Sequence, residues 1–324
     1  MSITTQSFFN NANSSKRPVT LFASSDYQLS PDTNGRIDIP LRKKGHIESI
    51  IQRFKQLKEQ GYQSVFINPG DLGDSGSSGS LLDFQFYTNK RNGLGFGVSD
   101  ELSAFKKLVV EPFKKAEMPD FETIGNHDVT QTNWGRFFGF LAKQTENLVN
   151  QIPGVSVEIP RPNIPRQAFS DYIKHRYGGT CYYRTVGDIN VVSLGLYPDK
   201  KALAWMEKNV PTDKPIVVFW HYNVSGPFSV EGSFGGPWWT KAEREKAFAI
   251  LNNKFQTLAV IVGHYHATDT YRFETIPVYV VGGGQYLELT IDPENAFKIT
   301  SQYHSGDDVE QAMGSEQITP VPAM

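Results

Sequence analysis

Seven residues with metal-binding side chains each come just after a short β-branched or apolar run of the chain. In chain order they are Asp26, Gln28, Asp71, Asn126, His221, His264 and His266. Carboxylate, amide and imidazole groups together suit borderline divalent ions such as Mn, Fe or Zn, with Mg and Ca as further candidates. One carboxylate that can bridge, and ligands enough for two ions, favour a dinuclear centre of the kind that holds a hydroxide against a phosphorus atom.

The runs that precede these ligands read as strands of an α/β sheet. They cover residues 19–23, 64–68, 121–124, 215–220 and 258–262. Apolar residues at helical spacing predict helices over residues 46–60, 101–116, 133–150, 200–209 and 241–252. Strand–helix–strand order favours parallel pairing, and open parallel sheets gather ligands outside the carboxyl ends of their strands. The ligand-bearing loops can therefore meet at one edge.

The remaining strands and the domain limits follow from turn signals and composition. Strands are expected over 182–186 and 190–194, joined by a turn at residues 187–188, and over 276–281 and 286–291. The chain reads as a flexible lead-in (1–17), a single domain (18–303) and a polar tail (304–324). Loop insertions are expected near residues 75–97, 151–178 and 222–239.

The composition excludes several classes of protein. The chain has 324 residues, a formal net charge of −2 and no basic block, which argues against a nucleic-acid binder that relies on phosphate electrostatics. The one cysteine, Cys181, allows no internal disulfide and is expected to be a buried strand thiol. The polar N-terminus lacks the apolar segment of a signal peptide, and no apolar run approaches membrane-spanning length. We expect a cytoplasmic protein, with export by a signal-independent route left open.

The ordered ligand strings resemble the calcineurin-like metallophosphoesterase family, whose pattern runs D-x-H, G-D-x-x-D, G-N-H-[DE], H and G-H-x-H. In this chain the matching strings begin at Asp26, Gly70, Gly125, His221 and Gly263, and the similarity spans roughly residues 18–290. The resemblance implies an α/β fold, a four-layer α/β/β/α sandwich of two mixed β-sheets flanked by helices.

The resemblance also implies two metal sites that share one carboxylate. The first takes its ligands from Asp26, Gln28, Asp71 and His266. The second takes its ligands from Asp71, Asn126, His221 and His264. Gln28 departs from the family pattern, which usually has histidine at this position. Because an amide oxygen is a harder and weaker donor than imidazole, the first ion is expected to bind less tightly or to favour Mn or Mg over Zn.

The activity that the resemblance implies is hydrolysis of phosphoric esters, with a metal-bridging hydroxide attacking phosphorus in line. His127 is not assigned to a metal and is expected to face the leaving group as an acid or charge stabiliser, with Asp74 orienting its imidazole. Candidate substrate contacts are Asn126, Tyr222 and Asn223. Asp128 reads as a helix N-cap.

The sequence leaves the ester class open. A phosphomonoester is the first hypothesis, and a phosphodiester of a cyclic nucleotide, lipid or glycerol type is the alternative. A monoesterase should offer extra cations to three terminal phosphate oxygens, and the candidates are Lys90, Arg91 and Arg184. In either case the partner is a small-molecule or lipid-head-group phosphate ester, and no protein partner is indicated.

Two segments near the ligands have an open role. The aromatic residues after His221 could wall a substrate pocket or form a minor core under a long loop; they are Phe228, Phe234, Trp238 and Trp239. Residues 75–97 follow the Asp71 string and are a candidate lid. Two non-enzymatic alternatives remain. One is a metal-stabilised binding module in which Gln28 weakens the first ion, and the other is a phospholipid-surface protein, which rests on the aromatic loop alone.

Overall fold

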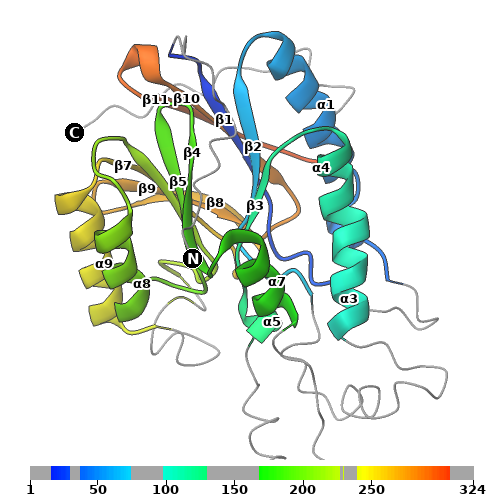
Figure 1. Cartoon of the computed structure of the whole chain (residues 1–324), viewed down its shortest axis with the longest axis horizontal. Helices are drawn as coiled ribbons and strands as arrows, with labels where there is room; N and C mark the ends of the chain where they lie inside the picture. Colours follow the sequence, from blue (N-terminus) through cyan, green and yellow to red (C-terminus); the bar gives the residue numbers. More distant parts are fainter. Residues whose placement is uncertain are drawn as a thin grey trace, which may run out of the picture.

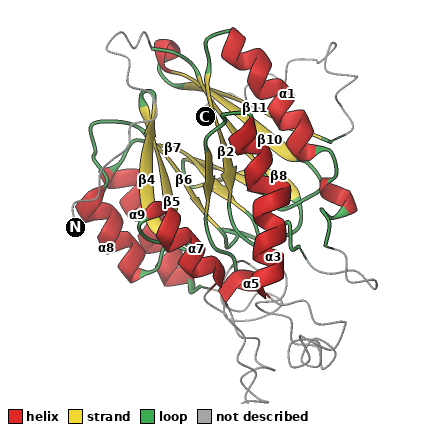
Figure 2. Ribbon diagram, turned by 45° about the vertical axis from the view of Figure 1, so that its right-hand side comes forward, coloured by secondary structure: helices red, strands yellow, loops and turns green. Residues whose placement is uncertain are grey.

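The computed structural model describes residues 16–29, 37–73, 98–129, 168–226, 229 and 239–306. Two mixed β-sheets lie face to face in the middle of the molecule, and helices cover their outer faces (Figure 1, Figure 2). On one side lie α1 (His46–Glu59), α3 (Val98–Phe105) and α4 (Glu111–Lys115). On the other side lie α8 (Lys200–Asn209) and α9 (Lys241–Lys254). The predicted four-layer sandwich is confirmed.

The first sheet has the strand order β11-β10-β1-β2-β3. Its strands are β1 (Val19–Ala23), β2 (Gln63–Asn68), β3 (Asp120–Glu122), β10 (Tyr286–Asp292) and β11 (Lys298–His304). β1, β2 and β3 run parallel, with Ala23 beside Ile67 and Ile67 beside Phe121, whereas β10 runs antiparallel to β1 and to β11. The carboxyl ends of β1, β2 and β3 therefore lie along one edge of the sheet.

The second sheet has the strand order β4-β5-β6-β7-β9-β8. Its strands are β4 (Cys181–Val186), β5 (Ile189–Leu194), β6 (Ile216–Trp220), β7 (Thr257–Val262), β8 (Thr268–Phe273) and β9 (Ile276–Val281). β5, β6, β7 and β9 are parallel, and the edge strands β4 and β8 are antiparallel to their neighbours. The carboxyl ends of β6 and β7 are thus adjacent.

Strand β6 shows how side-chain alternation builds two apolar cores. Val217 and Phe219 belong to the core between the sheets, whereas Val218 and Trp220 belong to the core under α8 and α9. Every residue of β6 is buried, as expected for a parallel strand covered on both faces. The uninterrupted apolar run in the sequence reflects this double burial.

The helix predicted over residues 101–116 is present, but it contains a π-helical segment. α3 leads into the π segment Lys106–Val110 and then into α4. Pro112 has no N–H to donate, and just before it the N–H of Glu111 bonds to the carbonyl of Lys106, five residues back. The proline therefore sits where the regular helical bonding pattern is already displaced.

Three elements differ from the sequence prediction. The irregular excursion predicted over 151–178 is wrong for its last part, which forms α7 (Ala168–Tyr177). The buried side chains Phe169, Ile173 and Tyr177 recur every four residues and form a stripe too narrow to stand out among polar neighbours. β8 and β11 were not predicted because both are edge strands with polar, partly exposed side chains. The predicted helix over 133–150 and the loop 75–97 lie outside the described residues.

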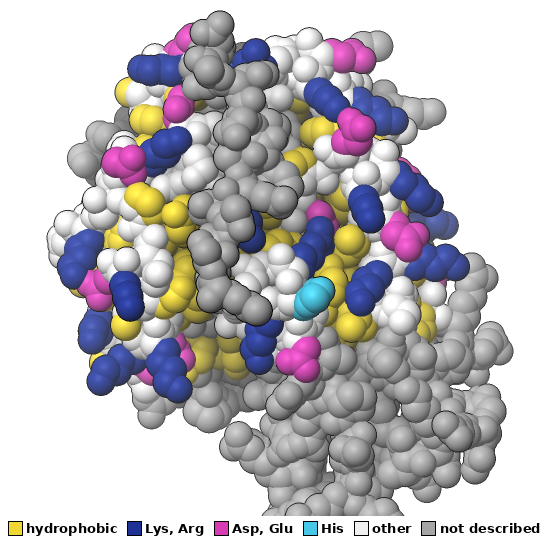
Figure 3. Space-filling model, viewed as in Figure 1, with side chains coloured by type: hydrophobic (Ala, Val, Ile, Leu, Met, Phe, Trp, Pro, Cys, Tyr) yellow, Lys and Arg dark blue, Asp and Glu magenta, His cyan; other side chains and the backbone are white. Residues whose placement is uncertain are grey.

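The described surface carries charges of both signs. On the face drawn in Figure 3, Lys and Arg side chains alternate with Asp and Glu and with small apolar areas. Within the described ranges, no helix combines the length and the apolar character needed to cross a bilayer.

Candidate metal centre

Five strand ends bring the predicted ligands together. Asp26 follows β1, Asp71 follows β2, His221 follows β6 and His264 follows β7, while Asn126 begins α5 (Asn126–Val129) after β3. Backbone hydrogen bonds connect these loops. The N–H of Asp26 donates to the Gly70 carbonyl at 3.0 Å, and that of Gly263 donates to the His221 carbonyl at 3.0 Å. The two sheets thus deliver their ligands to one place.

Five of the seven predicted ligands have left-handed backbone. Their φ angles are +58° at Asp26, +45° at Gln28, +54° at Asp71, +69° at His264 and +48° at His266. Residues other than glycine adopt this region rarely, at a cost on the order of 1–3 kcal/mol each. The strain is concentrated where the chain turns sharply after a strand, and these turns aim the side chains toward one another.

Two glycines allow the ligand loops to approach closely. A Cβ atom at Gly125 would overlap the carboxylate of Asp71, and one at Gly263 would lie 2.7 Å from Oδ2 of Asp26. Glycine is therefore required at both positions for the carboxylates to keep their places.

Among the described residues, two groups of side chains have donor atoms close enough to hold an ion. One group is Asp71, His221 and His264, and the other is Asp26, Asp71 and His266, with all donor atoms of a group within 4.8 Å of one another. Asp71 belongs to both groups, as the bridging role predicts. Carboxylate oxygen and imidazole nitrogen are the donors that Mn, Fe and Zn accept, so the residues present fit a pair of such ions.

The two carboxylates are buried and held ionised. Burial opposes ionisation of Asp26, yet the hydrogen bond from His266 and the charge of His221 bring its pKa well below the ordinary value. Burial likewise opposes ionisation of Asp71, and the charges of His221 and His127 lower its pKa. Hydrogen bonds fix both groups, since the N–H of His264 donates to Asp26 at 3.0 Å and the N–H of His127 to Asp71 at 2.9 Å.

The buried His221 and the half-buried His264 respond in opposite ways to this environment. Burial disfavours the charged form of His221, but the adjacent Asp71 and Asp26 outweigh it and raise its pKa. Burial and the neighbouring His221 lower the pKa of His264 to about 3, so this ring is neutral. A site that draws a proton onto a fully buried imidazole offers the negative potential that a divalent cation would also experience.

His221 and Asn126 are oriented as a pair. Nδ1 of His221 donates to the Pro69 carbonyl at 2.9 Å, and Nε2 lies 2.8 Å from Oδ1 of Asn126 and 3.3 Å from Asp71. A carbonyl that holds Nδ1–H leaves Nε2 to face the site, which is the usual arrangement of a metal-binding histidine. The amide oxygen of Asn126 faces the same point.

Gln28 lies at the same centre, but its amide oxygen points elsewhere. Oε1 accepts a hydrogen bond from Nη2 of Arg42 at 3.1 Å, and Nε2 is 3.4 Å from Oδ2 of Asp71. Nη2 of Arg42 also donates to the Asp26 carbonyl at 2.9 Å. Arg42 was not among the predicted site residues. It lies in the short 3-10 turn Leu41–Lys43, where no periodic pattern marks it.

His127 and Asp128 have separate roles beside Asp71. Nε2 of His127 lies 3.9 Å from Oδ2 of Asp71, and the side chain is 25% exposed. Asp128 accepts the N–H groups of Leu72, Gly73 and Gly125, so it ties the Asp71 loop to the Asn126 loop. The prediction that Asp128 is an N-cap is wrong, because it lies inside α5. Asp74, the predicted partner of His127, lies outside the described residues.

The loop after His221 is partly described. The buried ring of Tyr222 lies 5.0 Å from that of His264. Asn223 accepts from the Tyr271 hydroxyl at 2.7 Å and donates to the Ser225 carbonyl at 2.7 Å, which shapes the loop. Trp239 is buried against Trp220, in the core under α8 and α9 rather than in a separate minor core. Phe228, Phe234 and Trp238 lie outside the described residues, and Tyr222 and Asn223 stay predictions as substrate contacts.

Of the three cations predicted to bind phosphate, Arg184 alone is among the described residues. Lys90 and Arg91 lie outside the described residues. The guanidinium of Arg184 lies over the rings of Tyr177 and Tyr182 and lines a cavity to which none of the predicted ligands contributes. The structure does not bring Arg184 to the centre.

Known proteins resemble this chain in sequence or in structure. The sequence model of the calcineurin-like phosphoesterases matches residues 24–268, most of the chain. A search of curated protein sequences gave no match. Among solved structures, a purple acid phosphatase from yellow lupin seeds is 16% identical, with 91% of this chain and 52% of that one covered and a TM-score of 0.48. A dimetal phosphatase from Danio rerio is 12% identical, with 84% and 95% covered and a TM-score of 0.43.

A putative 5'-nucleotidase from Staphylococcus aureus is 14% identical, with 89% of this chain and 53% of that one covered and a TM-score of 0.43. The chain thus spans about half the length of the lupin and staphylococcal proteins. The family match includes every one of the seven predicted ligands, from the β1 loop to the loop after β7. The chain therefore belongs to the calcineurin-like phosphoesterase family.

Proposed function

We propose that this chain hydrolyses phosphate monoesters at a centre that takes two divalent ions. The observation that carries the proposal is the sharing of Asp71 between two sets of donor atoms, one with His221 and His264 and one with Asp26 and His266. When bound, two such ions supply a nucleophile at neutral pH and offset negative charge on the phosphoryl group. Membership of the family supports phosphoester hydrolysis, and the choice of a monoester is the finer part of the proposal.

Hydrogen bonds from the backbone hold three of the side chains at the centre. Backbone N–H groups hold Asp26 and Asp71, and a backbone carbonyl holds Nδ1 of His221. Because these side chains are held in place, little reorganisation of them is needed during the reaction. His127 lies next to Asp71 with its side chain partly exposed, so its imidazole can give a proton to the leaving oxygen of a bound ester.

The test is hydrolysis of p-nitrophenyl phosphate and of bis-p-nitrophenyl phosphate by protein stripped of metal and reloaded with Mn, Fe, Zn, Mg or Ca. We expect metal to restore monoester turnover, and His127→Ala to lower kcat by about 10²-fold while the number of bound ions is unchanged. His175→Ala, on the exposed side of α7, is the matched control and should have no effect.

Other outcomes would redirect or reject the proposal. Dominant diester turnover would make the protein a phosphodiesterase. Absence of turnover, in protein that holds one ion or none, would reject the catalytic function and leave a metal-stabilised binding module.

A further inference from the structure

Arg42 is held at the metal centre although most of its side chain is exposed. Its turn is anchored by the next residue, Lys43, which is fully buried. Nζ of Lys43 donates to the carbonyls of Gly283 and Val281 and to the hydroxyl of Ser24. These contacts fix the turn against the ends of β1 and β9. The guanidinium of Arg42 is thus positioned by the fold rather than by a surface contact of its own.

The bonds of Arg42 determine how Gln28 is oriented. A guanidinium can only donate, so Gln28 must turn its amide oxygen toward Arg42 and its amide nitrogen toward the centre. That nitrogen lies 3.4 Å from Oδ2 of Asp71. Oriented in this way, Gln28 connects Arg42 to the shared carboxylate of Asp71, and a first ion would be held by Asp26, Asp71 and His266.

The charge of Arg42 is not neutralised by these bonds. In the described part of the chain, both of its hydrogen-bond partners are uncharged oxygens, the Asp26 carbonyl and the Gln28 amide. Both bonds are made by Nη2, and no described residue accepts from Nε or Nη1. A guanidinium with these donors, beside a centre proposed to take phosphate esters, matches the geometry of phosphate, which it can bind through two parallel hydrogen bonds.

We propose that Arg42 binds the terminal oxygens of the substrate phosphate and favours monoesters over diesters, because a monoester has one more terminal oxygen and one more negative charge. The proposal rests on the proposed function in that it takes this centre to bind phosphate esters. It assigns Gln28 a new part, that of holding Arg42 in place rather than binding the first ion.

The test measures binding of inorganic phosphate to the full chain loaded with Mn²⁺, by calorimetry, together with the number of bound ions. We expect Arg42→Gln to weaken phosphate binding about tenfold or more, equivalent to about 1.4 kcal/mol, with both ions retained. Arg42→Lys, which keeps the charge but not the planar donor pair, should recover part of the affinity. Lys44→Gln removes the same charge from an exposed neighbour and should change nothing.

The kinetic counterpart separates this proposal from the proposed function. Arg42→Gln should lower kcat/KM for the monoester about tenfold and leave that for the diester within about threefold. Phosphate binding that depends on Arg42, without any turnover, would uphold Arg42 and reject the hydrolase. Unchanged phosphate affinity in Arg42→Gln would overturn the proposal, as would loss of an ion from that variant or no phosphate binding by the wild type.

Discussion

Two pairs of buried acids lie close to the first sheet, one on β3 and one at the ends of β1 and β2. Different groups surround the two pairs. Asp120 and Glu122, on β3, both accept hydrogen bonds from Arg176 of α7, and the Tyr177 hydroxyl donates to Glu122 at 2.6 Å. Asp26 and Asp71, at the ends of β1 and β2, have histidines, a hydroxyl, an amide and backbone N–H groups around them, and no described Lys or Arg side chain pairs with their carboxylates. A buried acid pair with its own arginine has a permanent counter-charge within the protein, whereas a pair that no described Lys or Arg contacts is the better candidate to receive metal ions.

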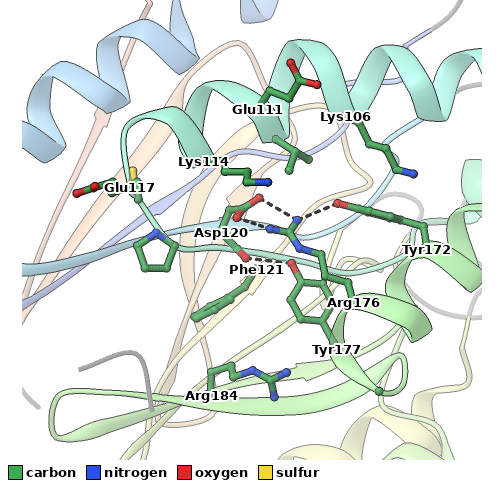
Figure 4. A pocket seen from close by; sticks show the side chains of 14 residues that line it. Lys106, Glu111, Lys114, Glu117, Asp120, Phe121, Tyr172, Arg176, Tyr177 and Arg184 are labelled. Atoms are coloured by element: carbon green, nitrogen blue, oxygen red, sulfur yellow. Dashed lines mark hydrogen bonds and ion pairs between the residues drawn. The ribbon is translucent and has the colours of Figure 1, made fainter. Parts of the chain in front are cut away.

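A hollow in the surface does not by itself distinguish the two regions. A cavity of about 800 Å³ lies beside Arg176, with Lys106, Lys114 and Arg184 in its lining (Figure 4). Figure 4 shows the guanidinium of Arg176 between the carboxylate of Asp120 and the hydroxyl of Tyr172. The acids that Arg176 meets are thus already satisfied within the protein, so charge balance, rather than the size of a cavity, marks the metal centre.

The largest expected difference between the two acid pairs follows from replacing Asp71, the carboxylate that both sets of donor atoms share. Asp71→Asn should lower monoester turnover by about 10³-fold, since stabilisation by metal ions amounts to several kcal/mol, and should reduce the number of bound ions. Asp120→Asn is the matched change in the other pair and should keep both ions and the turnover. Metal content and kcat/KM of the two variants are the measurements. If Asp71→Asn kept both ions and its turnover, metal binding would depend on Asp71 no more than on Asp120.

The second prediction concerns Arg176, the cation that contacts Asp120 and Glu122. Arg176→Met should destabilise the fold by about 3 kcal/mol, because two buried acids lose their partner while the arginine itself is partly exposed at 27%. The variant should hold its ions as the wild type does. Urea unfolding measures the loss, and Lys174→Met, which breaks an exposed pair with Asp171 on the same helix, should change stability by about 0.5 kcal/mol or less. Equal losses in the two variants would show that Arg176 is not the counter-charge of the buried acids.

The sequence predicts the candidate metal centre better than it predicts the contacts of Arg176 with Asp120 and Glu122, for a physical reason. Each predicted ligand follows an apolar strand run, and the carboxyl ends of parallel strands in one sheet lie along one edge. Asp71 and His221 follow strands of different sheets, and it was the family resemblance that implied they meet. Arg176 pairs with Glu122 across 54 residues of chain and depends on α7, whose narrow apolar stripe gave no clear period.

Arg42 was missed for a related reason. It lies in an irregular turn, and its bond to the Gln28 side chain exists only once Lys43 is buried at the ends of β1 and β9. The basic run at residues 42–44 was visible in the sequence, but nothing local connects it with the loop of Asp26. The one sequence feature that pointed to Arg42 was Gln28, which stands where the family usually has histidine. An amide at this position can accept a hydrogen bond from a donor elsewhere in the chain, and Arg42 is that donor.

At acidic pH, Glu122→Gln is the variant expected to change the free energy of unfolding least. Burial and the neighbouring Asp120 raise the pKa of Glu122 to about 8, so the folded chain holds a proton here that the unfolded chain releases near its ordinary value of 4.5. Between these two pH values the folded state binds more protons than the unfolded state, and wild-type stability should therefore fall as pH rises through this window. Glutamine is uncharged like the protonated acid, so at pH 4, below both pKa values, the variant should differ from wild type by less than about 1 kcal/mol. By pH 8.5 the free energy of unfolding of the variant should have gained on that of the wild type. Equal slopes for the two proteins would mean that Glu122 is ionised beside Arg176, and that both acid pairs carry full negative charge.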